Sequence, residues 1–154
     1  MAGNMKLTLI IMAALVAVLL GLGACSLALG ARVPEPVKIE VTTDEFADQN
    51  NVSRNVTVPV GGTLTIALAS NPSTGFGWSE PPSVSNEAVL QQTSNKLLLP
   101  ETSPIVGAPA TQAWTMRALH AGTTTVNMTY DRPWQGGEKG RWTFEVEVTV
   151  EEKD

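Results

Sequence analysis

Two short segments carry the residue types that could recognise another protein. The first runs Asn71-Pro72-Ser73-Thr74-Gly75-Phe76-Gly77-Trp78, and the second is Arg132-Pro133-Trp134. Proline and glycine fix the shape of a loop, while Arg and Trp contribute strongly to binding at protein interfaces. Because both segments fall between runs that are typical of β-strands, we interpret them as rigid loops that offer a binding surface.

The first segment should be stiff, since its turn residues each restrict the backbone. Asn71 can hydrogen-bond its own backbone, Pro72 fixes φ, and Gly75 can take a positive φ. The small side chains of Ser73 and Thr74 then lie at the loop tip. On turn chemistry alone, a tight turn without a partner remains the alternative.

The second segment combines a cation with a flat aromatic side chain on a backbone that Pro133 restricts. The alternative here is that Trp134 folds over the end of the domain and leaves Arg132 in solvent. For Trp78 we expect a structural role instead. It lies just inside a predicted strand, so we assign it to the core.

The chain lacks the residues of several enzyme classes. It contains one His and one Cys, His120 and Cys25, so Cys–His catalysis and Cys/His zinc sites lack their groups. His120 lies in a predicted turn, and no glycine-rich phosphate loop is present. The formal net charge is −5, with no concentration of basic residues that would suit nucleic acid. We predict a chain that is not an enzyme and takes no cofactor or metal.

The first 24 residues have the pattern of an export signal. A short start with one Lys precedes an uncharged apolar run, Leu7–Leu22. This run is short for a membrane-spanning helix, which needs about 20 residues. The sequence Leu22-Gly23-Ala24-Cys25 resembles a bacterial lipobox, which implies cleavage before Cys25 and a lipid on its sulfur. An ordinary signal peptide or an uncleaved anchor is the alternative.

The expected organisation therefore has three parts. Residues 1–24 are a lipoprotein signal peptide, residues 25–36 a short tether and residues 37–154 one domain. The chain would be exported and held at a membrane of the cell envelope by the lipid on Cys25.

Apolar and polar residues alternate with period two along most of the domain, which predicts β-strands. Pro59 suggests an edge strand, and Gly61-Gly62 suggests a hairpin turn. No helical stripe follows residue 36. The pattern predicts an all-β, immunoglobulin-like antiparallel β-sandwich of seven or eight strands. The predicted strands are Val37–Val41, Val56–Val60, Leu64–Leu68, Trp114–Ala118, Val126–Tyr130 and Trp142–Val150, with a weaker one over Ala88–Leu98 that breaks near Ser94-Asn95.

The order of the predicted strands indicates where the loops between them lie in the sandwich. In an immunoglobulin-like sandwich, Asn71–Gly77 would be the B–C loop, Leu99–Thr111 the D–E loop and Asp131–Gly140 the F–G loop. These three loops share one end of such a sandwich. The two recognition segments are thus predicted to be neighbours despite their separation in the sequence.

Both segments resemble signature loops of the chagasin family, which inhibits papain-like cysteine proteases. Asn71–Gly75 match the family's Asn-Pro-(Ser/Thr)-Thr-Gly, and Arg132–Trp134 match its Arg-Pro-(Trp/Phe). The resemblance spans Val37–Val150. The family's middle motif, Gly-x-Gly-Gly, is matched at Gly107, but the chain has Pro and Ala where the last two glycines stand.

The resemblance implies a reversible, monomeric inhibitor that occludes the cleft of a papain-like cysteine protease without doing chemistry itself. The first loop would wedge over the catalytic Cys and His of the protease, and the other two would brace it. A structural or adhesive envelope lipoprotein is the alternative, and exposure of Thr74 and Trp134 on one edge would argue against it. The implied protease-binding residues are Asn71, Pro72, Ser73, Thr74, Gly75, Phe76, Gly107, Ala108, Pro109, Ala110, Arg132, Pro133 and Trp134.

Overall fold

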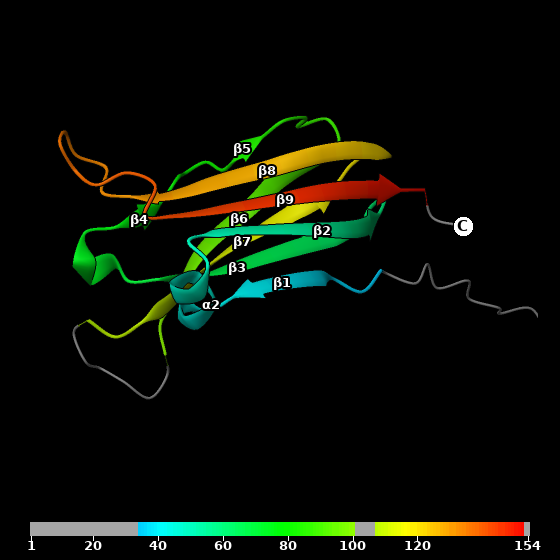
Figure 1. Ribbon diagram of the computed structural model, residues 1–154. Helices are drawn as coiled ribbons and strands as arrows, with labels where there is room; N and C mark the ends of the chain where they lie inside the picture. Colours follow the sequence, from blue (N-terminus) through cyan, green and yellow to red (C-terminus); the bar gives the residue numbers. More distant parts are fainter. Residues whose placement is uncertain (1–33, 101–106, 153–154) are drawn as a thin grey trace, which may run out of the picture. The chain divides into compact units, whose positions relative to one another are not determined.

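The computed structural model describes residues 34–100 and 107–152, which form two facing β-sheets (Figure 1). Residues 1–33 lie outside the described part, and with them the expected signal peptide, most of the tether and Cys25. Those expectations therefore stay predictions. Within the described residues, no helix has the length and apolar character needed to cross a membrane.

The described residues form nine strands, which are arranged in two sheets. The four-stranded sheet has the order β1-β3-β7-β6, and the second sheet has the order β2-β9-β8-β4, with β5 also paired to β8. The first sheet comprises β1 (Val37–Val41), β3 (Thr63–Ser70), β7 (Ala110–Ala118) and β6 (Leu90–Leu98). The second comprises β2 (Asn51–Pro59), β9 (Trp142–Glu151), β8 (Gly122–Asp131), β4 (Gly77–Trp78) and β5 (Ser83–Val84).

The predicted all-β sandwich is confirmed, but two details of it were wrong. The described residues form nine strands rather than seven or eight, and the sheets are mixed rather than antiparallel. β1 pairs with β3 in parallel, and β2 pairs with β9 in parallel. The chain leaves the first sheet after β1, runs through β2 in the second sheet and returns as β3. This double crossing lets β1 and β3 run in the same direction.

Gly61-Gly62 does form a turn, but not the predicted hairpin. The backbone N–H of Gly62 donates to the carbonyl of Pro59 over 2.8 Å, and Gly61 has φ +75°. The strands on either side of this turn belong to different sheets, so the turn carries the chain across the sandwich. Pro59 does end an edge strand, as predicted, since β2 is the outermost strand of its sheet.

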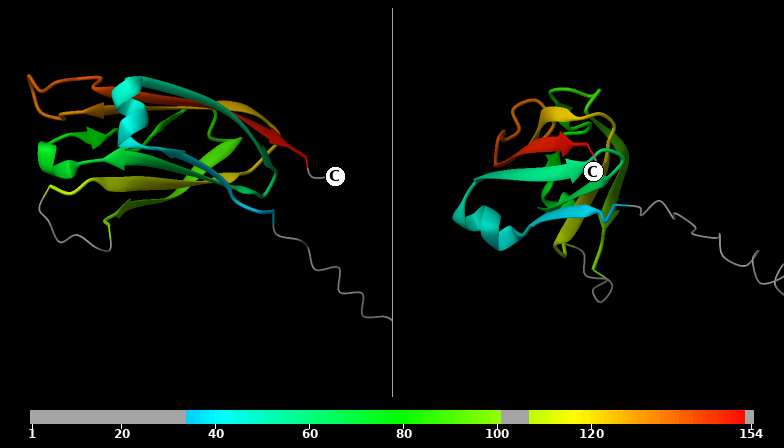
Figure 2. Two further views of the ribbon diagram at one scale, coloured as in Figure 1. Left: turned by 60° about the horizontal axis from the view of Figure 1, so that its bottom comes forward. Right: turned by 90° about the vertical axis from the view of Figure 1, so that its right-hand side faces the viewer.

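A short helix, α2 (Thr43–Asp48), connects β1 to β2 and was not predicted. The Thr42 hydroxyl caps it by accepting from the backbone N–H of Glu45, and Phe46 is fully buried beneath it. Six residues are too few to show an apolar stripe with helical period. The Thr42-x-x-Glu45 pattern, which is typical of a helix start, was the signal available. Figure 2 shows α2 between the ends of β1 and β2.

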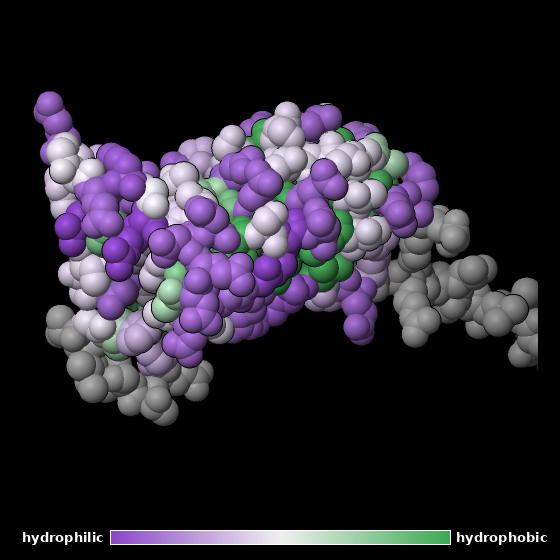
Figure 3. Space-filling view, in the orientation of Figure 1, coloured by the Kyte–Doolittle hydropathy of each residue, from purple (hydrophilic) through white to green (hydrophobic). Residues whose placement is uncertain are grey.

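The core lies between the sheets and holds without a disulfide, because the chain has a single Cys. Buried and more exposed residues alternate along β8 and β9, as the period-two pattern predicts, whereas every residue of β3 from Ile66 to Ser70 is buried. Trp78 and Trp114 meet edge to face, with ring centroids 6.5 Å apart. Hydrophilic residues cover most of the face seen in Figure 3. Among the described residues, most large apolar side chains are buried in this core.

The described parts of the three predicted loops lie at one end of the sandwich (Figure 1). One follows β3, another joins β6 to β7, and the third joins β8 to β9. The expected D–E loop, Leu99–Thr111, begins correctly after β6 but ends two residues too late, because Ala110 and Thr111 already belong to β7.

Candidate functional site

The B–C loop, residues 71–76, is a compact turn held by its own hydrogen bonds. Pro72–Thr74 form one turn of 3₁₀-helix, and Gly75 ends it in the left-handed region with φ +79°. The Thr74 hydroxyl donates to the carbonyl of Asn71 over 2.6 Å, and the Ser73 hydroxyl donates to the Asn71 side-chain oxygen over 2.6 Å. A loop with this many internal bonds loses little conformational entropy when it binds a partner.

Two further bonds tie this loop to its neighbours. The backbone N–H of Asn71 donates to the Tyr130 hydroxyl over 2.7 Å, and the Asn71 side-chain amide donates to the carbonyl of Gly107 over 3.2 Å. Asn71 thus links the B–C loop to β8 and to the D–E loop. Sequence reasoning missed Tyr130. It is the chain's one Tyr and stands at an inward-facing position, and a buried phenol usually needs a hydrogen-bond partner.

The F–G loop, residues 132–141, folds around Arg132. The backbone N–H of Arg132 donates to the carbonyl of Glu138 over 2.9 Å, and the Lys139 ammonium donates to the carbonyl of Arg132 over 2.6 Å. The backbone N–H of Gly137 also donates to the carbonyl of Trp134 over 3.1 Å. These bonds fix the tip of the loop without help from a partner.

Arg132 is not free in solvent, contrary to one of the sequence alternatives. Its guanidinium carbon lies 4.5 Å from the centroid of the Phe76 ring and 5.9 Å from that of Trp134. Such cation–π contacts orient the guanidinium and connect the B–C and F–G loops. The Phe76 ring therefore packs against the Arg132 guanidinium and is not an isolated aromatic side chain at the surface.

Trp134 leans on the B–C loop and still exposes 51% of its surface. A Cβ atom placed on Gly75 would lie 2.5 Å from Cη2 of Trp134, a distance that real side chains do not adopt. Glycine is therefore needed at residue 75 for two reasons, the positive φ and the seat of the indole. The two recognition segments touch each other, as the strand order predicts.

The D–E loop is described only from Gly107 onward and before residue 101. Gly107 is exposed with φ +94°, and Pro109 is also exposed. Ala110 is different, because it is 5% exposed and is the first residue of β7, paired with Ser70. Strand pairing and burial therefore remove its side chain from the loop surface, and its contact with a protease stays a prediction.

The remaining predicted site residues form one continuous edge. Pro72, Ser73, Thr74, Pro133 and Trp134 are exposed, and Asn71, Gly75, Phe76 and Arg132 are half-buried beneath them. We name residues 71–76, 107–109 and 132–134 the loop edge. Among residues 34–100 and 107–152, no group of three His, Cys, Asp or Glu side chains could hold a metal ion, and His120 is an exposed turn residue.

Comparison with known proteins gives sequence relatives that cover most of the domain. The model of the chagasin family peptidase inhibitor I42 matches residues 57–148. Chagasin from Trypanosoma cruzi is 40% identical over 97 residues, which are 59% of this chain and 84% of chagasin. Amoebiasin-2 from Entamoeba histolytica is 33% identical over 87 residues, which are 56% of this chain and 69% of amoebiasin-2.

Solved structures show the same fold. The cysteine protease inhibitor EhICP2 from Entamoeba histolytica has a TM-score of 0.60 and 23% identity, and the match covers 77% of this chain and 99% of that protein. PbICP-C, solved in complex with falcipain-2, has a TM-score of 0.51 and 16% identity, covering 78% of this chain and 100% of that one. At these identities the two likenesses concern the fold alone.

Proposed function

Because the chain belongs to the chagasin family of peptidase inhibitors, we propose that it inhibits papain-like cysteine proteases reversibly by occluding the active-site cleft. The family consists of inhibitors, so the chain is not an enzyme. The observation that carries the proposal is the joined loop edge. The tip residue Thr74 and the aromatic Trp134 are both exposed on it, while their loops are already fixed.

In the proposed mechanism the B–C loop enters the cleft first. Its tip carries the small side chains of Ser73 and Thr74, which suit a narrow cleft above a catalytic Cys and His. Trp134, held by Gly75 and Arg132, would press its flat face on the protease beside the cleft. Such an interface would bury on the order of 1,600 Å² in total. No bond is made or broken in the inhibitor.

The D–E loop would brace the other side through its backbone. The positive φ and exposure of Gly107 favour close approach of another chain at that residue. The bond from Asn71 to the Gly107 carbonyl keeps this part of the loop beside the wedge. Pro109 replaces a family glycine there and adds a ring to the surface, so we expect the range of inhibited proteases to depend on it.

The first prediction is inhibition itself. Residues 26–154 contain the compact unit 33–154 and its described core, so this fragment should fold without the signal segment. It should inhibit papain and related proteases reversibly and leave trypsin untouched, because the proposed mechanism requires a papain-type cleft. Steady-state assays with a fluorogenic peptide measure this. Absence of inhibition of several papain-like enzymes at about micromolar inhibitor would contradict the proposal.

We also propose that the chain is an exported lipoprotein anchored through Cys25, on the basis of the lipobox-like sequence before it. Replacing Cys25 with Ala should move the protein from the membrane to the soluble fraction without changing its inhibition constant, because the Cys precedes the domain. Fractionation followed by immunoblotting measures the location. A Cys25→Ala protein that stays in the membrane fraction would instead indicate an uncleaved anchor.

A third prediction concerns Tyr130. Tyr130→Phe keeps the ring stack but removes the acceptor of the Asn71 backbone N–H. An unmade bond to a partly buried N–H costs about 1–2 kcal/mol, so the B–C loop should become more mobile and inhibition about fivefold or more weaker. Amide hydrogen exchange at Asn71 should accelerate in parallel. Unchanged exchange and inhibition would show that the bond does not order the loop.

A further inference from the structure

Three of the four large apolar side chains that are exposed among the described residues are consecutive. Leu97, Leu98 and Leu99 expose 45%, 51% and 68% of their surface, and the fourth side chain is Trp134 of the loop edge. Single exposed leucines are common, whereas a contiguous exposed apolar patch often marks a contact with another molecule. Leu97 and Leu98 end β6, and Leu99 follows it at the start of the D–E loop. The packing of the two sheets does not use these side chains.

Two of the leucines border a shallow hollow of about 280 Å³ on the outer face of the first sheet. Small side chains of β3 and β7, such as Ala67 and Ala113, also line it, and Leu98, Leu99 and Pro109 lie at its end toward the loops. The ion pair on β1 lies on the opposite side of the hollow, since β1 and β6 are the two outer strands of this sheet. An apolar centre with a polar margin is the usual composition of a protein contact. We name Leu98 and Leu99 the leucine pair.

Leu97 does not belong to this hollow. In the register of β6 and β7, Leu97 is paired with Gln112 and Leu98 with Thr111. Because side chains alternate along a strand, Leu97 faces away from the hollow that Leu98 borders. The two residues are therefore of the same type and similarly exposed, but they lie on opposite faces of one strand.

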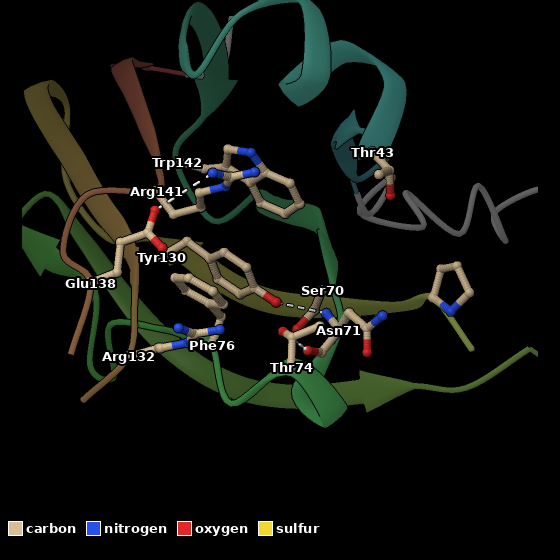
Figure 4. Close-up of a pocket in the computed structure, with 11 residues that line it drawn as sticks. Thr43, Ser70, Asn71, Thr74, Phe76, Tyr130, Arg132, Glu138, Arg141 and Trp142 are labelled. Carbon is tan, nitrogen blue, oxygen red and sulfur yellow. Dashed lines mark hydrogen bonds and ion pairs between the residues drawn. The ribbon is translucent and has the colours of Figure 1, made fainter. Parts of the chain in front are cut away.

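The hollow is continuous with the loop edge, because Pro109 belongs to both. Leu98 lies level with Ala69 two strands away, which corresponds to about 10 Å at the usual strand spacing. In Figure 4, Asn71 and Thr74 of the B–C loop lie directly after the end of that strand, β3. A standard interface buries about 800 Å² on each partner and is roughly 30 Å across. A protease bound to the loop edge would therefore also reach the hollow.

A second copy of the chain fits this surface less well. β6 is an edge strand, but its bulge between Gln92 and Ser94 and the exposed charge of Lys96 both oppose pairing with another strand. Two leucines also cover far less than the roughly 800 Å² that each partner of a stable complex buries. Such a patch enlarges a contact that other residues make.

We propose that the leucine pair extends the protease contact of the loop edge and binds an apolar part of the protease surface beside its cleft. The inference rests on the proposed function, and it adds the chemistry of a second protease surface that the chain recognises. Removing apolar surface from water on both partners stabilises the complex. Unlike exposed charge pairs, a contact of this kind is not screened by salt.

The test replaces both members of the leucine pair in residues 26–154. The variant with Leu98→Ser and Leu99→Ser should inhibit papain about tenfold more weakly, mainly through faster dissociation. Its melting temperature should stay nearly constant, because both side chains are exposed. The ratio of the two inhibition constants should be the same at about 0.05 M and about 0.5 M NaCl. Leu97→Ser is the matched control and should change inhibition less than about twofold.

Equal inhibition by the wild type and the double variant would overturn this proposal and leave the proposed function intact. A wild type that inhibits no papain-like protease would overturn both. Equal weakening by Leu97→Ser would show that the hollow is not the contact, and the assignment would be wrong.

Two further measurements cover other occupants of the hollow. Analytical ultracentrifugation would detect a dimer, and sedimentation with phosphatidylglycerol vesicles would detect binding to a lipid surface. If either association occurs in the wild type and is lost in the double variant, while inhibition is unchanged, the leucine pair serves that partner and the protease assignment is overturned. The expected result is a monomer that does not sediment with the vesicles.

Discussion

Replacing Trp78 with alanine is expected to lower the free energy of unfolding by about 3–5 kcal/mol. The side chain is 6% exposed, and its indole N–H donates to the carbonyl of Ala69 over 2.9 Å. Its ring lies 5.4 Å from Phe46, 5.0 Å from Tyr130 and 6.5 Å from Trp114, so truncation would open a cavity among three rings. Unfolding in urea, followed by circular dichroism, measures the change.

Trp134→Ala is the matched comparison, because it makes the same substitution at an exposed position. The melting temperature should stay nearly constant, since 51% of the side chain is in solvent. Inhibition should weaken about thirtyfold, the effect of the roughly 2 kcal/mol that a Trp typically contributes at an interface. If Trp134→Ala unfolds the domain and Trp78→Ala does not, the roles of the two side chains have been exchanged, and the loop edge is wrongly placed.

Most strands could be predicted because every second residue of a strand in a sandwich faces the core, so apolar and polar residues alternate within a short stretch of sequence. Trp142–Glu151 shows this alternation over nearly its whole length, in the sequence and in the burial of its side chains. The β-bulge between Gln92 and Ser94 lies beside the break that the sequence predicts at Ser94-Asn95. A strand was predicted at Trp78, where β4 lies, but the two-residue strand β5 was missed, since so short a segment contains no period to detect.

Strand direction and sheet membership could not be predicted in the same way. An apolar residue that faces the core gives the same sequence pattern whether the adjacent strand runs parallel or antiparallel. The parallel pairing of β1 with β3 could therefore not be detected in the sequence. Gly61-Gly62 shows the same limit. Two glycines permit a turn, but whether the chain then pairs back or crosses to the opposite sheet depends on the far strands β9 and β7.

The loop edge was predictable in outline for a different reason. Pro72, Gly75 and Pro133 have backbone preferences that hold in any surrounding, so the stiffness of the loops follows from residue types. The contacts between loops are another matter. The stack of Arg132 on Phe76 and the bond from Asn71 to Tyr130 join segments far apart in sequence, and only the folded domain creates them.

Thr74→Arg should weaken protease inhibition about tenfold or more while leaving the melting temperature nearly unchanged. Thr74 is exposed at the tip of the proposed wedge, where added bulk must enter the cleft with the loop. Its hydroxyl donates to the Asn71 carbonyl over 2.6 Å, a bond that Thr74→Ser retains. The serine variant is thus the control and should inhibit nearly as well as the wild type.

The comparison of the two variants separates steric exclusion from loss of loop order. If the arginine and serine variants weaken inhibition equally, the Thr74 methyl group matters and bulk does not, so the tip does not enter a narrow cleft. If neither weakens it, the B–C loop is not the wedge. The expected result is a selective effect of arginine, because its long side chain collides with a protease cleft that only a small tip can enter, whereas the 3₁₀ turn beneath it stays bonded in both variants.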